Sequence, residues 1–134
     1  MTSKPQAEAK AKVIPLPFTK IQHHYLDKMA IPSQGKVEFI HANKIICIQA
    51  CGNYSKIHLA GNKRFTACIT LKRFEERLNP VQFIRVHQGS IVNTHYIECY
   101  LQNENKLLLL NSMLINVSRS RKPIINQFIK HITL

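Results

Sequence analysis

Turn residues divide this chain into short runs of apolar or alternating side chains, and the close spacing of these turns limits what the chain can fold into. Short runs that alternate polar and apolar residues, or are rich in β-branched residues, are typical of strands. Residues 32–35, Pro-Ser-Gln-Gly, separate two such runs as a hairpin turn does. The runs lie at 28–31, 36–40, 45–49, 54–59, 64–68, 83–87, 91–93, 97–101, 106–110 and 114–117. The pattern predicts a mainly β fold rich in hairpins.

Two segments change to helical spacing, and we expect short helices at about 70–79 and 121–132. Thr70 is a suitable N-cap for the first, and Pro80 ends it. Pro123 fits the first turn of the second helix. The first helix carries charges of both signs, which favours a packed amphipathic helix over a DNA reader. The side chains predicted to form the core are Ile46, Ile48, Ile57, Leu71, Phe74, Ile84, Val92, Ile97 and Val117.

The four cysteines indicate free thiols rather than a disulfide framework. Cys47 and Cys99 fall within apolar runs, where we expect them to pack as small apolar side chains. No Cys-x-x-Cys pair occurs in the sequence. A zinc site built on Cys47, Cys51 and histidines is an alternative that their spacing does not favour. Free thiols fit a reducing cytoplasm, which is the location we expect.

The charge of the chain is strongly positive, with 19 Lys and Arg against 7 Asp and Glu and a formal net charge of +12. Such a charge attracts polyanions, nucleic acid first and an anionic membrane surface second. The alternative is a basic protein whose charge only keeps it soluble. No run of about 18 apolar residues indicates membrane insertion, and the N-terminus lacks the pattern of a secretion signal. We expect a basic, mobile N-terminal arm over 1–27 and one domain over 28–134.

Three segments combine basic or amide side chains with turn residues, at 52–56, 85–90 and 118–122. Arg and Lys can pair with the guanine edge, Asn and Gln with the adenine edge, and Ser and Lys with phosphates. These are the side chains that a protein reading DNA needs. Polar loops are common, however, so composition alone leaves open that these are three ordinary loops.

The sequence gives little support for catalysis. It has no pair of carboxylates in a loop, no Gly-x-Ser-x-Gly elbow and no glycine-rich phosphate loop. His87 lies close to Ser90, but no acid is placed to orient the histidine as a base. We therefore expect no enzyme, no catalytic residue, no bound metal and no cofactor.

Four blocks of the sequence resemble, in order, the LytTR family of DNA-binding domains, which includes the output domains of LytR- and AlgR-type response regulators. They are IICIQACGNYSKIHL at 45–59, ITLKRFEERL at 69–78, FIRVHQGSIVN at 83–93 and INVSRSR at 115–121. The third resembles the family's most diagnostic block, usually F-x-R-x-H-R-S-aromatic-x-V-N. The resemblance as a whole extends over roughly residues 28–132.

The resemblance implies a fold of small antiparallel sheets with short helices. It also implies a regulator that places loops in successive major grooves of duplex DNA and binds direct repeats as a pair of protomers. The implied DNA contacts lie in the same three segments, and the candidate residues are Asn53, Tyr54, Ser55, Lys56, Arg85, His87, Gln88, Gly89, Ser90, Arg119, Ser120 and Arg121. Among them, Gln88 is the candidate base reader, whereas Arg85 and His87 either support the second loop or touch phosphate.

The sequence departs from the family pattern at 88–90, where Gln-Gly-Ser replaces the usual Arg-Ser-aromatic. Gln88 suits adenine rather than guanine, Gly89 is expected to loosen the loop, and Ser90 removes a ring. Gln49 replaces a common Glu and removes a negative charge. These changes predict an altered site preference. The alternative is a LytTR-like interaction module whose DNA reading is weakened or lost.

Many relatives carry an N-terminal receiver domain with a phosphorylatable Asp, whereas the arm of this chain is too short for one. We therefore expect a standalone regulator. The activity of such a regulator would be controlled by its abundance, by a separate inhibitory or signalling partner, or by oligomerisation such as a homodimer on DNA.

Overall fold

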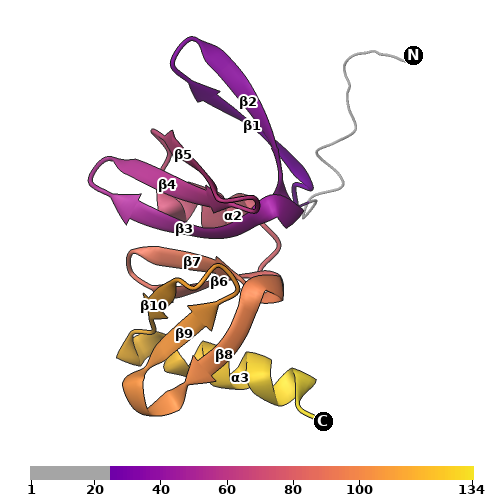
Figure 1. Cartoon of the computed structure of the whole chain (residues 1–134), viewed down its shortest axis with the longest axis vertical. Coiled ribbons are helices and arrows are strands. Elements are labelled where there is room, and N and C mark those ends of the chain that lie inside the picture. The colour runs from indigo at the N-terminus through magenta and orange to yellow at the C-terminus, as the bar shows by residue number, and fades with distance from the viewer. Residues whose placement is uncertain (1–24) are drawn as a thin grey trace.

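Residues 25–134 form three antiparallel sheets and two α-helices in a computed structural model, which confirms the predicted mainly β fold (Figure 1). The helices are α2, Leu71–Arg77, and α3, Lys122–Ile132. The strands are β1 Lys28–Ser33, β2 Lys36–His41, β3 Ile45–Cys51, β4 Tyr54–Leu59, β5 Lys63–Ala67, β6 Phe83–His87, β7 Ser90–Asn93, β8 Ile97–Leu101, β9 Lys106–Leu109 and β10 Leu114–Asn116. The predicted arm, except for residues 25–27, lies outside the described residues.

The three sheets follow one another along the long axis of the molecule (Figure 1). The β1–β2 hairpin lies at one end, and a five-stranded sheet of order β5-β4-β3-β7-β6 lies in the middle. A three-stranded sheet of order β10-β9-β8 lies at the other end, beside α3. Because β3 pairs with both β4 and β7, the β3–β4 and β6–β7 hairpins become neighbours in the central sheet.

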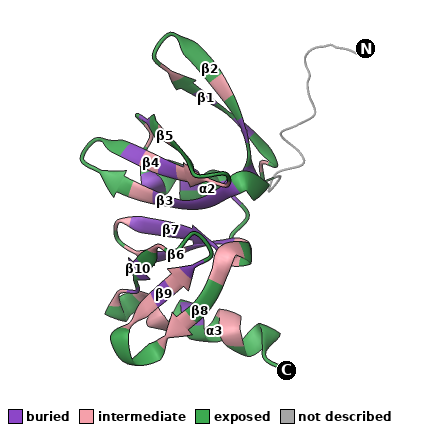
Figure 2. Ribbon diagram, viewed as in Figure 1, coloured by how far each residue is buried: buried purple, intermediate pink, exposed green. Residues whose placement is uncertain are grey.

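Apolar residues on both faces of the central sheet are buried, so the domain has two cores (Figure 2). One core lies between the sheet, α2 and the β1–β2 hairpin, and includes Ile48, Ile57 and Phe74. The other lies between the sheet, the β8–β10 sheet and α3, and includes Val92 and Ile125. The predicted core residues that the structure buries are Ile46, Ile48, Ile57, Leu71, Phe74, Ile84, Val92 and Val117.

Two predictions about β8 are wrong. Ile97 is only partly buried, and Cys99 is exposed rather than packed. β8 is an edge strand of its sheet, and its register with β9 shifts between Ile97 and Cys99, so its side chains are only partly covered. The prediction for Cys47 is confirmed, because it is buried and burial raises the pKa of its thiol to about 12.

The N-terminal ends of both helices follow from local sequence. Thr70 caps α2, and its Oγ1 accepts a hydrogen bond of 3.2 Å from the backbone N–H of Arg73. Pro123 lies in the first turn of α3, where its missing N–H leaves no bond unmade. Within residues 25–134, no helix is long and apolar enough to cross a membrane.

Candidate nucleic-acid interface

The first predicted segment is the turn of the β3–β4 hairpin. Gly52 has φ +63°, the left-handed conformation that a two-residue hairpin turn requires and that glycine adopts without strain. Asn53 and Tyr54 are exposed at this turn, whereas Lys56 is half-buried farther along β4. Ser55 points to the opposite face, where it is buried and donates a hydrogen bond to the carbonyl of Ile69. Strand alternation therefore removes Ser55 from the exposed surface of this segment.

The second predicted segment is the turn of the β6–β7 hairpin, with exposed Gln88 at its tip. The backbone N–H of Gly89 donates to Nδ1 of His87 at 3.0 Å, and its carbonyl accepts from the N–H of Ala50 at 2.9 Å. Nη2 of Arg85 donates to the carbonyl of Gln88 at 2.6 Å. Gly89 is expected to loosen this loop, but three hydrogen bonds hold it, and one of them joins it directly to β3.

The third predicted segment is a single 3-10 turn, Arg119–Arg121, between β10 and α3. β6 is an edge strand, and its register with β7 shifts near Val86. The carbonyl of Val86 accepts a 2.9 Å hydrogen bond from the N–H of Ser118. Arg119 and Ser120 are exposed, whereas Arg121 is half-buried. The third segment is thereby attached to the strand that leads into the second.

A small network of ion pairs joins α2 to the second and third segments. Oε1 of Glu75 accepts from Nη1 of Arg85 at 3.2 Å, and Oε2 of Glu75 lies 3.9 Å from Nη1 of Arg121. Nη1 of Arg121 also lies 3.5 Å from the carbonyl of Arg85. The Arg85 side chain is only 18% exposed, so its contacts are shielded from bulk water. Arg85 and Arg121 therefore hold neighbouring segments in place.

A row of polar side chains crosses the central sheet between the first and second segments. Lys56, Gln49, Ser90 and His87 occupy directly opposite positions on β4, β3, β7 and β6. Opposite residues of antiparallel strands point to the same face. All four line a groove of about 370 Å³, which Asn116 of β10 also lines. We call these four residues the polar row.

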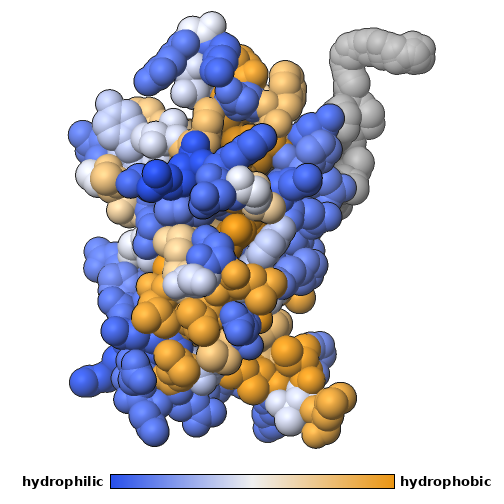
Figure 3. Space-filling view, viewed as in Figure 1, coloured by the Kyte–Doolittle hydropathy of each residue, from blue (hydrophilic) through white to orange (hydrophobic). Residues whose placement is uncertain are grey.

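The surface beside the polar row is positively charged. His58 pairs with Arg64 across β4 and β5, and its Nε2 donates to Oε1 of Gln49 at 2.9 Å. Partial burial lowers the pKa of His58, and the charges of Lys56 and Arg64 lower it further. Figure 3 shows hydrophilic side chains over the central strands and an apolar area toward β8–β10. The positive charges of Lys56 and Arg64 on this surface attract anions.

The structure thus brings the three predicted segments together, but it divides their residues by accessibility. Asn53, Tyr54, Gln88, Arg119 and Ser120 are exposed. Lys56 and His87 are half-buried and line the groove, whereas Ser90 lines it but is buried, because β7 is a central strand. Arg85 and Arg121 bond to neighbouring segments.

Three residues near the segments were not predicted as site residues: Gln49, Glu75 and Asn116. Gln49 could have been placed from its register opposite Lys56, but that register depends on which strands are neighbours. Glu75 is hidden in a helix of mixed charge, and its role follows only from the packing of α2 against β6. Among residues 25–134, no group of three or more His, Cys, Asp or Glu side chains is arranged to hold a metal ion.

Comparison with known proteins places this fold in a family. The LytTr DNA-binding domain family matches residues 35–130. A solved LytTr DNA-binding domain from Bacillus cereus aligns with a TM-score of 0.67 and 20% identity, over 78% of this chain and 97% of that chain. At that identity the likeness concerns the fold.

Two transcription regulators share part of the sequence. The CO-responsive transcriptional regulator RcoM of Rhodospirillum rubrum is 33% identical over 86 residues, 64% of this chain and 36% of that protein. The transcriptional regulatory protein LytR of Staphylococcus aureus is 33% identical over 88 residues, 63% of this chain and 35% of that protein. The chain therefore spans about a third of the length of these relatives. Because the family match covers most of the chain, this chain belongs to the LytTr DNA-binding domain family.

Proposed function

We propose that the chain is a transcription regulator that binds duplex DNA through the three segments, without a recognition helix. The observation that supports this most is their convergence, since Ala50 bonds to Gly89 and Ser118 bonds to Val86. The resulting surface is basic and carries exposed amide and guanidinium groups, which suit base edges and phosphates. RcoM and LytR, which share part of this sequence, are transcriptional regulators.

The proposed contacts are exposed residues together with Lys56, which is half-buried in the groove. Gln88 lies at the tip of the second turn and is the proposed base reader, because a Gln side chain pairs with the adenine edge in the major groove. Asn53 and Lys56 contact DNA from the first segment, and Arg119 contacts it from the third. Arg85, His87 and Arg121 act mainly as positioning residues, since each already forms at least one side-chain hydrogen bond within the protein.

Two protomers on a spaced direct repeat are the proposed arrangement, with the segments entering successive major grooves. The test is selection of bound duplexes from a random pool, followed by sequencing. We expect recovery of a direct repeat with adenine-containing half-sites. A protein carrying both Lys56→Ala and Arg119→Ala serves as the matched control and should recover less DNA.

A selection in which no sequence is enriched would contradict sequence-specific regulation. If the protein also retains no duplex at low salt, the interaction-module alternative replaces the proposal. Enrichment of a single half-site would keep DNA reading but remove the paired arrangement.

A further inference from the structure

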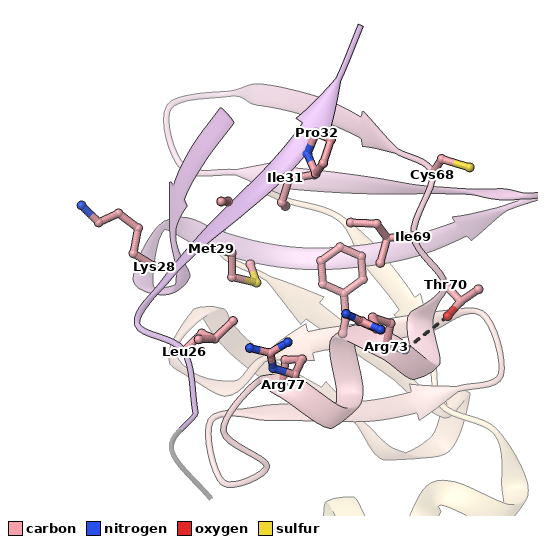
Figure 4. A pocket seen from close by; sticks show the side chains of 12 residues that line it. Leu26, Lys28, Met29, Ile31, Pro32, Cys68, Ile69, Thr70, Arg73 and Arg77 are labelled. Carbon is pink, nitrogen blue, oxygen red and sulfur yellow. Dashed lines mark hydrogen bonds between the residues drawn. The ribbon is translucent and has the colours of Figure 1, made fainter. Parts of the chain in front are cut away.

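A hollow lies between β1 and α2, beside the core that contains Ile48, Ile57 and Phe74 (Figure 4). Its volume is about 620 Å³, within the range of sites that bind small molecules. Leu26 and Ile69 line it and are only partly buried, and beneath them lie Met29, Ile31 and Phe74, which are buried. The hydrogen bond from the N–H of Leu26 to the carbonyl of Arg77, 3.1 Å, ties the start of the hairpin to the end of α2.

The rim of this hollow is basic. Lys28, Arg73 and Arg77 line it, all three are exposed, and none of its lining residues within 25–134 is acidic. Arg73 and Arg77 are one helical turn apart on α2, and Figure 4 shows both guanidinium groups below β1. Neither arginine forms a salt bridge with another residue between 25 and 134. The hollow therefore joins an apolar floor to two guanidinium groups that have no acidic partner among residues 25–134.

We propose that this hollow binds a small amphipathic anion, with a hydrocarbon or aromatic body on the apolar floor and a carboxylate between Arg73 and Arg77. A guanidinium group binds a carboxylate through strong, charge-assisted hydrogen bonds. Burial of the apolar body against the partly exposed side chains of Leu26 and Ile69 supplies the hydrophobic contribution. The three segments of the proposed DNA surface do not contribute residues to this hollow.

The position of the hollow suits a regulatory ligand. α2 contributes Arg73, Phe74 and Arg77 to it, and the same helix carries Glu75, which bonds to Arg85 and contacts Arg121. A ligand that shifts α2 would therefore act on the residues that hold the second and third segments.

The test is titration of the full chain, without DNA, with octanoate and 4-phenylbutyrate, followed by amide chemical shifts in NMR spectra. We expect saturable shifts at Met29, Ile31, Ile69 and Phe74. The neutral amides of both acids should bind at least about tenfold more weakly, because the charge-assisted bonds are lost. Since no DNA is present, this outcome is independent of the proposed function.

The matched variants separate the pocket from general charge. Arg73→Gln combined with Arg77→Gln should weaken both acids at least about tenfold. Lys72→Gln, which removes an exposed charge of the same helix outside the hollow, should leave binding unchanged. The proposal is overturned if neither acid gives saturable shifts around the hollow, if the amides bind as well as the acids, or if the Lys72 variant loses as much as the double variant.

Discussion

The two hairpin turns of the proposed DNA surface have the same length but are shaped differently. The β3–β4 turn depends on Gly52, whose φ of +63° is left-handed. In the β6–β7 turn, Gly89 is outside the left-handed region. That turn is instead held by the ring of His87 and the guanidinium group of Arg85. One turn takes its shape from the backbone freedom of a glycine, and the other from side chains of the preceding strand.

This difference separates residues that contact a ligand from residues that position others. Asn53 at the first turn and Gln88 at the second have exposed side chains. Arg85 donates hydrogen bonds to Glu75 and to the carbonyl of Gln88, and Nδ1 of His87 accepts one from Gly89. A basic residue in a DNA-binding segment is therefore not automatically a DNA contact.

The largest expected effect comes from Arg85→Ala. It removes the bonds to Glu75 and to the carbonyl of Gln88, and we expect the free energy of unfolding to fall by about 1.5–3 kcal/mol. DNA affinity should fall as well, since the second turn loses its support. Denaturant unfolding and DNA titration measure both effects. Arg64→Ala is the control for stability, because Arg64 is exposed and has no salt bridge within residues 25–134; an equal loss of stability from it would contradict the positioning role.

Next is Gln88→Ala, compared with Lys56→Ala. The first should relax preference at one base position by about 1–3 kcal/mol. The second should lower the affinity for all DNA sequences alike, and it should make the slope of log affinity against log salt concentration shallower by about one. Binding to a panel of duplexes with single base changes measures both. If the two variants lose affinity equally for every sequence, Gln88 does not read a base.

The glycines give a sharper comparison of the turns themselves. A Cβ at Gly52 would meet no atom within 4 Å, and one at Gly89 would meet only ordinary contacts at 3.7 and 4.0 Å, so conformation is the main difference. Gly52→Ala should lower the free energy of unfolding by about 1–2 kcal/mol. Gly89→Ala should leave it unchanged or raise it by up to about 1 kcal/mol. Denaturant unfolding compares them, and equal destabilisation would show that the turns do not differ in this way.

The smallest expected effect concerns pH. The folded state lowers the pKa of His58 below its usual 6.5, so the unfolded chain takes up this proton more readily. Stability from this group is therefore present above the usual histidine pKa and is lost as the pH falls below it. Between about pH 7 and about pH 5, His58→Gln should lose less stability than the unchanged chain. An equal loss in both would mean that His58 does not contribute to the pH dependence.

Much of the fold follows from local sequence signals. The alternation in 54–59 places Ile57 inside and Lys56 outside, and Thr70 and Pro80 bound the first helix, as the structure has them. The errors at Ile97 and Cys99 have a different cause, since an edge strand and a central strand have similar residues and differ only in their neighbours. The same holds for the site. The segments could be recognised by composition, but the role of Glu75 and the polar row depend on long-range pairing.

The central claim is that these segments form one cationic surface for duplex DNA. Its most direct test is the affinity for a selected duplex as a function of salt concentration. If about six to eight phosphates are neutralised, the slope of log affinity against log salt should be about −5 to −7. In the protein carrying both Lys56→Ala and Arg119→Ala, the slope should become shallower by about two. A flat salt dependence of the unchanged chain would contradict the account.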